Sequence, residues 1–283
     1  MSITSQEFDF VRRLISTSSG ITLEDGKEYL VDMRLASVAR QFEISSVSDL
    51  IARMQSPSET RLHRPVVDAM TTNETSFFRD LHPFDAVRTD LLPEMMKLRA
   101  AERKLTIWCG ASSTGQEPFT LAMLIREHFP ELARWKVEIV ATDISGAVLA
   151  KAREGIFSQL EVNRGLPATY LIKYFQTGAK GWRLKDDILK MVDFRYLNLI
   201  EKWPEMPSCD LVFMRNVMIY FKIEIKKAIL RKIANVMRSD GYLLLGGSET
   251  TLNLDDAYQR VPVGKTICYR LGKAAGSAAP KKV

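Results

Sequence analysis

The sequence lacks the features of a membrane-spanning or secreted protein. No apolar run approaches the roughly 18 residues that a spanning helix requires. Residues 1–10 contain neither the basic segment nor the apolar segment of a secretory signal peptide. We therefore expect a cytoplasmic protein with no direct insertion into a membrane.

Cysteine and histidine are scarce. The three cysteines, Cys109, Cys209 and Cys268, lie far apart, each in or at the end of an apolar segment, which indicates buried free thiols. The three histidines are also scattered. Neither residue type has the close spacing of zinc ligands, so no metal site is expected.

Positive charge is unevenly distributed along the chain. The net charge is +6, yet residues 1–72 carry a slight acidic excess. The positive charge therefore belongs to the remainder, where five cations fall on one expected helix. Such a helix usually presents a solvated face, and a basic docking surface for an acidic partner is the alternative. The five are Lys222, Lys226, Lys227, Arg231 and Lys232.

Residues 1–72 show helical apolar spacing and no strand pattern. The later helices open with serine and carry an acid within about three residues, as helix starts prefer. We predict an N-terminal all-helical domain over residues 1–72, followed by a linker over 73–84. The expected helices span residues 8–20, 24–42, 46–54 and 58–70.

From residue 105 onward, short apolar strands alternate with helical stretches, which predicts a parallel sheet covered on both faces. The last two strands lack a crossover helix, so we expect the final strand to run antiparallel at or near the sheet edge. This mixed sheet favours a methyltransferase over a dinucleotide dehydrogenase. The domain is expected over 85–272, with strands at 105–108, 137–141, 211–214, 242–245 and 266–271.

An insertion at residues 156–195 is expected to form a small β-subdomain. It contains a turn at 178–181 and two candidate strands, 182–184 and 188–194, which we interpret as a hairpin. The Ala/Gly/Ser/Lys-rich tail, 273–283, is predicted to be disordered.

A glycine-bearing turn joins the first strand to the next helix. Gly110 and Gly115 let the backbone pass close to a ligand, and Pro118 suits the first turn of a helix. A complete Gly-x-Gly-x-x-Gly motif, which a diphosphate ligand prefers, is absent. The segment is thus either a cofactor-binding turn that presents Glu117 or a plain strand-to-helix connection.

Asp143 follows the second strand, somewhat over 20 residues beyond the glycine turn. A carboxylate there can accept hydrogen bonds from a ribose diol, although Asp143 or Ser145 could instead cap the next helix. S-adenosylmethionine has no phosphate, and its sulfonium favours carboxylates and aromatic faces. The sequence suits that cofactor better than NAD; the candidate groups are Glu117, Phe77, Phe78 and Tyr220.

Five motifs in order closely resemble those of the chemotaxis receptor methyltransferases, the CheR family. They are Asn-Glu-Thr-Ser-Phe-Phe-Arg at 73–79, Ser-Thr-Gly-Gln-Glu-Pro at 113–118, Ala-Thr-Asp at 141–143, Asn-Leu at 198–199 and Arg-Asn-Val-Met-Ile-Tyr-Phe at 215–221. The resemblance implies an α/β Rossmann-like S-adenosylmethionine-dependent methyltransferase domain with a mixed sheet, a small β-subdomain insertion and an N-terminal all-helical domain. It also implies formation of glutamate methyl esters on methyl-accepting chemoreceptors, with S-adenosyl-L-homocysteine as the product.

The same resemblance assigns roles to individual residues. It places Arg79 and Tyr220 near the transferred methyl as catalytic residues. Because a glutamate carboxylate is already ionised at neutral pH, the acceptor needs no general base and positioning dominates. Without the resemblance, Arg79 would be taken for an ion-pair partner and Tyr220 for a core aromatic. The implied cofactor-binding residues are Asn73, Thr75, Arg79, Glu117, Asp143, Asn198, Leu199, Arg215 and Asn216.

The resemblance also implies a protein partner. Family members meet the receptor with a basic amino-terminal helix, for which Lys27, Arg34 and Arg40 are the candidates here. The turn at 178–181 is shorter than in members that anchor the receptor tail, so tail binding by the β-subdomain is not expected. Asn216-Val-Met-Ile lacks the proline pair of nucleic-acid amino-methyltransferases, which argues against the rival interpretation of a nucleic-acid methyltransferase, so no nucleic-acid partner is expected. A catalytically idle module that senses S-adenosylmethionine is the remaining alternative.

Overall fold

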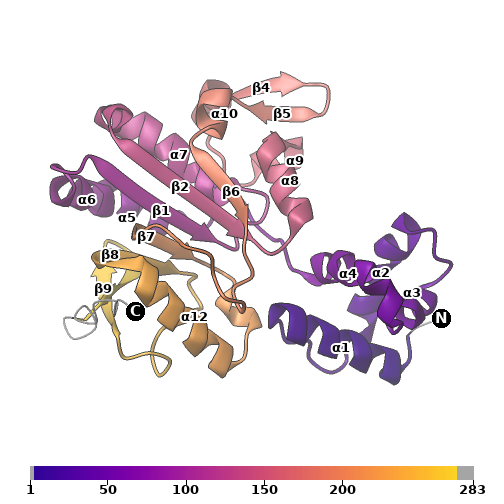
Figure 1. Ribbon diagram of the computed structural model, residues 1–283. Helices are drawn as coiled ribbons and strands as arrows, with labels where there is room; N and C mark the ends of the chain where they lie inside the picture. The colour runs from indigo at the N-terminus through magenta and orange to yellow at the C-terminus, as the bar shows by residue number, and fades with distance from the viewer. Residues whose placement is uncertain (1–2, 273–283) are drawn as a thin grey trace.

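The amino-terminal helices form a domain with its own apolar core, at the lower right of Figure 1. The structure is a computed structural model that describes residues 3–272, so the tail predicted to be disordered lies outside the described residues. The helices are α1 (Ser5–Ser19), α2 (Glu28–Gln41), α3 (Val47–Met54), the 3₁₀ turn η1 (Pro57–Leu62) and α4 (His63–Met70).

Local signals fix where α1 begins and ends. Thr4 and Glu7 form a reciprocal capping box at its start, and Gly20 ends it in the left-handed conformation with φ 75°. The apolar stripe of α1 packs against those of α2, α3 and α4. The fully buried residues of this core include Val11, Ile15, Val31, Leu35, Leu50, Ile51 and Val66.

A seven-stranded mixed sheet forms the second domain, in the order β6-β2-β1-β7-β8-β10-β9. Neighbours from β6 to β8 pair in parallel, whereas β10 is antiparallel to both β8 and β9. The predicted mixed sheet is therefore confirmed, with the final strand next to the edge. The strands are β1 (Lys104–Gly110), β2 (Lys136–Asp143), β6 (Val192–Tyr196), β7 (Cys209–Met214), β8 (Met237–Leu245), β9 (Tyr258–Val263) and β10 (Thr266–Leu271).

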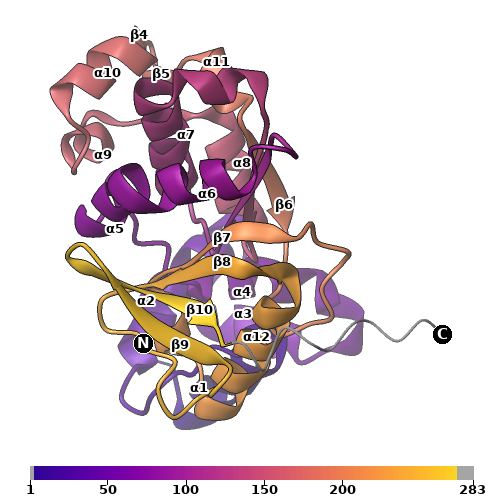
Figure 2. The same cartoon turned by 90° about the vertical axis from the view of Figure 1, so that its left-hand side faces the viewer.

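Helices cover both faces of this sheet (Figure 2). Within β1, Ile107 and Cys109 face one apolar core, whereas Trp108 faces the other. The first face carries α5 (His82–Ala86), the π turn η2 (Val87–Leu91), α6 (Leu92–Leu98), α7 (Gln116–His128) and the 3₁₀ turn η3 (Pro130–Arg134). The other face carries α12 (Ile223–Val236), and α8 (Gly146–Glu154) lies beside β2 and β6.

The insertion contains a hairpin, but not the predicted pairing of 182–184 with 188–194. Residues 186–189 form α11 (Asp186–Leu189), and 192–196 form β6, which pairs with β2 in the main sheet. Phe194 packs edge-on against Phe119 of α7 at 5.4 Å between ring centroids, and this burial draws the strand to the large sheet. The subdomain sheet is instead β3 (Ile156–Phe157), β5 (Gly181–Leu184) and β4 (Phe175–Gly178), next to α9 (Gln159–Asn163) and α10 (Ala168–Tyr174).

A buried charge network joins α6 to the amino-terminal ends of the central strands. Arg99 donates from Nε to Asp210 Oδ1 at 2.6 Å and from Nη1 to Asp240 Oδ2 at 2.9 Å. The second carboxylate oxygen of Asp210 accepts the backbone N–H of Thr106 at 2.8 Å. Arg99 and Asp210 are both almost fully buried, so loss of either would leave the other charge without its buried partner.

The expectation that the cysteines are buried free thiols agrees with the structure. Cys109, Cys209 and Cys268 are buried and free. Residues 3–272 hold no cluster of side chains that could bind a metal ion. Within the same range, no helix is long and apolar enough to cross a membrane.

Candidate active site

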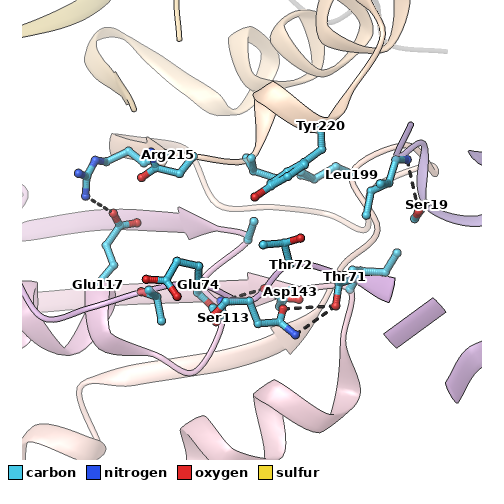
Figure 3. Close-up of a pocket in the computed structure, with 18 of the residues that line it drawn as sticks. Ser19, Thr71, Thr72, Glu74, Ser113, Glu117, Asp143, Leu199, Arg215 and Tyr220 are labelled. Atoms are coloured by element: carbon cyan, nitrogen blue, oxygen red, sulfur yellow. Dashed lines mark hydrogen bonds and ion pairs between the residues drawn. The ribbon is translucent and has the colours of Figure 1, made fainter. Parts of the chain in front are cut away.

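The loops at the carboxyl ends of β1, β2 and β7 enclose a cavity together with the linker that precedes α5 (Figure 3). In an open α/β sheet this edge is where ligands bind. Figure 3 shows Arg215 and Tyr220 on one wall and Ser113 and Asp143 on the other. The ten residues that the motif resemblance assigned to the site all line the cavity: Asn73, Thr75, Arg79, Glu117, Asp143, Asn198, Leu199, Arg215, Asn216 and Tyr220. Phe77 and Phe78, the other aromatic candidates for the sulfonium, do not line it, because their rings pack against Phe157 and Tyr170, respectively.

The glycine turn between β1 and α7 forms one end of this cavity. Gly115 has φ 93° and precedes α7; a Cβ atom there would lie 2.8 Å from Phe119 Cε2. Ala111 and Ser113 also have positive φ, of 53° and 52°. This tight turn presents backbone and small side chains to the cavity, as a cofactor-binding turn requires.

Asp143 is the last residue of β2, and its carboxylate faces the glycine turn. Its Oδ2 accepts the backbone N–H of Ser113 at 2.8 Å, and its Oδ1 accepts that of Ser145 at 2.9 Å. Ser145 caps α8, so the capping role that was open for Asp143 belongs to Ser145. Burial raises the pKa of Asp143, and no cation of the described chain forms an ion pair with it. The carboxylate keeps lone pairs for further donors such as hydroxyl groups.

Glu117 and Arg215 form a buried ion pair in the wall of the cavity. Arg215 Nη1 donates to Glu117 Oε2 at 2.7 Å. Its Nη2 donates to the carbonyl of Arg79 and to Asp80 Oδ2, both at 2.8 Å. Burial raises the pKa of Glu117, and Arg215 opposes that rise. Through Arg215 the linker is hydrogen-bonded to the loop that follows β7. The charges of Glu117 and Arg215 cancel each other beside the cavity.

Arg79 and Tyr220 reach the cavity from the linker and from the 3₁₀ turn η4 (Met218–Tyr220), respectively. Arg79 Nη1 donates to the carbonyl of Glu74 at 2.8 Å. Among the described residues, no carboxylate forms an ion pair with Arg79, so the ion-pair role considered from the sequence is not observed. Most of its N–H groups remain available to a ligand.

Comparisons with known proteins identify the family. The model of the CheR methyltransferase SAM-binding domain matches residues 73–267, and that of the CheR methyltransferase all-alpha domain matches residues 6–71. The chain belongs to the CheR methyltransferase family. Chemotaxis protein methyltransferase 1 of Pseudomonas aeruginosa is 41% identical over 95% of this chain and 99% of its own. Chemotaxis protein methyltransferase 1 of Vibrio cholerae is 39% identical over 96% of this chain and 98% of its own.

This CheR protein is a methyltransferase that uses S-adenosyl-L-methionine, and its cavity fits that cofactor. Ser112 Oγ and Arg215 Nε are buried without a hydrogen-bond partner in the described chain, and both residues line the cavity. Such atoms are costly to leave unpaired, so a polar ligand is expected beside them. Together with the carboxylate of Asp143, they provide donors and acceptors suited to a nucleoside.

The amino-terminal domain of the CheR chain supplies part of the cavity wall, which the sequence did not indicate. Ser19 and Ile21 line the cavity, and Ile21 forms an antiparallel bridge with Phe221. The backbone N–H of Thr22 donates to the carbonyl of Tyr220 at 3.0 Å. Both domains thus hold the segment that carries Tyr220.

Arg34 is turned inward rather than toward solvent. Its guanidinium donates to the carbonyls of Met70 and Thr71, at 2.7 and 3.1 Å, and to Thr72 Oγ1 at 3.2 Å. Thr71 and Thr72 line the cavity. The structure therefore places Arg34 as a support of the linker, although its type and position on α2 had suggested a docking residue.

Glu249, in the loop after β8, was missed by the motif comparison. Its Oε2 accepts the backbone N–H groups of Asn216 at 2.8 Å and Gly246 at 2.6 Å, and its Oε1 accepts that of Ile219 at 3.3 Å. Asn216 has φ 58°, a conformation that needs such support. A Cβ atom at Gly246 would lie 2.7 Å from Asn216 Nδ2, so only glycine allows this approach. Glu249 thereby fixes the loop between β7 and Tyr220.

Replacing Glu249 with glutamine should lower the rate of methyl transfer by about 10- to 100-fold, since small misplacements of reacting groups have effects of this size. The glutamine amide would bring an NH₂ group against backbone N–H donors, which shifts Asn216 and Tyr220. Single-turnover rates and circular dichroism spectra test this. Asp256→Asn, an exposed acid in the same loop, is the matched control. Equal rates for wild type and Glu249→Gln would show that the hydrogen bonds of the Glu249 carboxylate are not needed for methyl transfer.

Proposed function

We propose that this CheR protein methylates glutamate side chains on the cytoplasmic domains of chemoreceptors, forming methyl esters during chemotaxis adaptation. The observation that carries the proposal is the convergence of Arg79 and Tyr220 on the cavity that holds Asp143 and the Glu117–Arg215 pair. The names of the similar proteins, which refer to chemotaxis, support it.

The cavity residues divide into a nucleoside end and a reacting end. Asp143 accepts hydrogen bonds from the ribose hydroxyls, and Asn198 and Leu199 frame the same end. When bound, S-adenosyl-L-methionine supplies an electrophilic methyl group, and S-adenosyl-L-homocysteine is left after transfer. Asn73, Thr75 and Asn216 complete the walls of the cavity.

At the reacting end, Arg79 holds and orients the acceptor carboxylate. A guanidinium can donate two parallel N–H bonds to a carboxylate, which fixes the direction of the attacking oxygen. The acceptor, with an ordinary pKa of about 4.3, is ionised at neutral pH, so no group of the enzyme must remove a proton. Tyr220, which also lines the cavity, limits the positions that the carboxylate can take.

Replacing Asp143 with alanine should weaken binding of S-adenosyl-L-methionine by about 10- to 100-fold, because hydrogen bonds to a charged group contribute about 1.5–3 kcal/mol. Isothermal titration calorimetry measures the affinity. Ser145→Ala is the matched control, because it removes the α8 cap and should lower the melting temperature without a comparable loss of affinity. An unchanged affinity in Asp143→Ala would remove Asp143 from the cofactor site.

For receptor docking we propose the exposed face of α2. Arg40 lies on this face and Lys27 at its start, and Tyr29 and Met33 expose large apolar surfaces between them. Arg34 does not take part in this proposal because its guanidinium supports the linker. Only two residues join β4 to β5 in the subdomain hairpin, so we do not propose that it anchors a receptor tail.

Transfer of labelled methyl from S-adenosyl-L-methionine to chemoreceptor-containing membranes tests the proposed function. We expect label in the receptor that alkali releases, as it releases a methyl ester. Label that resists alkali would indicate another acceptor atom. Cofactor binding without any transfer would favour a sensing module in place of an enzyme acting on these receptors.

A further inference from the structure

Helix α12 begins beside the active-site cavity. Val217, Tyr220 and Phe221 line the cavity, and α12 starts two residues later at Ile223. One face of the helix is buried against the sheet through Ile229, Leu230 and Ile233. Beside the buried face, Ile223, Lys227 and Arg231 follow one another at intervals of four and form a single stripe, in which Ile223 and Arg231 are exposed and Lys227 is half-buried.

Four cations lie on or directly before this helix: Lys222, Lys226, Lys227 and Arg231. Lys227 and Arg231, which belong to the stripe, form what we call the α12 basic face, whereas Lys226 lies in line with the buried residues Ile229, Leu230 and Ile233. Within the described part of the chain, none of the four cations forms an ion pair or a side-chain hydrogen bond. Lys232 differs, because its ammonium donates to the carbonyls of Leu199, Ile200 and Glu201. Glu224 is the one acid on α12. The two unpaired charges of the α12 basic face, Lys227 and Arg231, favour an acidic partner.

Exposed apolar side chains adjoin the α12 basic face. Ile219 and Ile223 are 48% and 56% exposed. Leu252, 72% exposed, lies in the loop whose Glu249 accepts the backbone N–H of Ile219. Solvation explains an exposed cation but not large aliphatic side chains that are exposed close to it in the chain. The surface therefore matches a partner that is both acidic and partly apolar.

We propose that the α12 basic face docks an acidic, amphipathic helix of the chemoreceptor, the one that carries the acceptor glutamate. This inference rests on the proposed function and deepens it by naming the surface that presents the acceptor. The stripe from Ile223 to Arg231 is about 12 Å long at 1.5 Å per residue, or two to three turns of a partner helix. Its first residue is three positions from Tyr220, so a helix along α12 brings its end to the reacting groups.

The position of α12 relative to the amino-terminal domain agrees with this arrangement. Phe221, just before the helix, pairs with Ile21 at the end of α1, and Figure 1 shows α12 and α1 on the same side of the molecule. A receptor helix on α12 would therefore run close to the amino-terminal domain. Docking on α12 and docking on α2 are separate contacts that one elongated receptor can make together.

Charge reversal tests this docking surface. The double variant Lys227→Glu/Arg231→Glu should raise the KM for receptor about tenfold or more, with kcat at saturating receptor and the affinity for S-adenosyl-L-methionine unchanged. Its rate should also depend less on salt than that of wild type. The control is Lys97→Glu/Lys190→Glu, which makes the same change of charge at exposed positions on α6 and before β6.

Binding measured separately from transfer distinguishes the two proposals. Cosedimentation with chemoreceptor-containing membranes should be lost in the α12 variant and retained in the control. A wild-type protein that binds the receptor membranes but transfers no methyl would contradict the proposed function. Receptor binding by the two double variants would still test the role of α12 in that case. Equal receptor binding by both double variants would overturn the α12 assignment. The α12 assignment would also be overturned if wild type bound equally well to membranes with and without receptor, because the protein would then bind the lipid surface.

Discussion

Replacement of Arg79 with alanine is expected to slow methyl transfer by about 100- to 1,000-fold, which is the effect of removing a donor that positions a reacting group. The fold should remain intact, because the described contacts of the Arg79 side chain amount to one hydrogen bond to the carbonyl of Glu74. Single-turnover kinetics at saturating cofactor measure the chemical step, and thermal denaturation checks the fold. Arg79→Lys should recover part of the rate at most, since an ammonium cannot donate a planar pair of bonds.

Arg164→Ala is the matched control for Arg79. Arg164 forms an exposed ion pair with the side chain of Glu74, the residue whose carbonyl Arg79 contacts, but it does not line the cavity. Its loss should leave turnover near the wild-type value, because exposed ion pairs contribute little to stability. Unchanged turnover in Arg79→Ala, or an equal loss in both variants, would show that Arg79 has no role in presenting the acceptor.

Replacement of Asp210 with alanine should lower the free energy of unfolding by about 3–5 kcal/mol, the usual effect of removing one member of a buried ion pair. Arg99 would keep Asp240 but lose its buried partner, and the N–H of Thr106 would lose its acceptor. Urea denaturation followed by circular dichroism measures the change. A loss below about 1 kcal/mol would mean that water replaces the missing carboxylate.

Asp240→Ala is the comparison, with a smaller expected loss because the Asp240 side chain is 36% exposed. The hydrogen bond from Arg99 holds the pKa of Asp240 below its ordinary value. A lowered carboxyl pKa stabilises the folded state above the unfolded pKa, and this contribution disappears as the pH falls through the folded pKa. Stability should therefore decrease on acidification in wild type and decrease less in Asp240→Ala.

The order of the strands and the glycine turn could be predicted, because both depend on residues that are close together in the sequence. The alternation of short apolar strands with helices gave the order of β1, β2, β7, β8 and β10, because strands covered on both faces are continuously apolar. The glycine turn was predictable since Gly115 needs a positive φ. The residues of the site were found through motif resemblance, and the structure gathers them around one cavity.

Pairing between distant segments was not predictable in the same way. The alternating burial of β6 suits a hairpin as well as a sheet edge, and pairing with β2 decides between them. Strand β9 was missed because it carries Pro262 and polar residues, which sheet edges tolerate. Arg34, Thr22 and Glu249 each form a hydrogen bond to a backbone group. Every residue has such groups, so the sequence does not show which residue is the partner.

The bridge between Ile21 and Phe221 makes occupancy of the cavity and attachment of the amino-terminal domain interdependent. If that domain loosens, Ser19 and Ile21 leave the cavity wall and the carbonyl of Tyr220 loses its donor. By thermodynamic reciprocity, a cofactor that binds only the closed cavity favours the attached domain by the same free energy. The helical domain is thus a structural part of the catalytic centre, and its local unfolding would act as an off state of the enzyme.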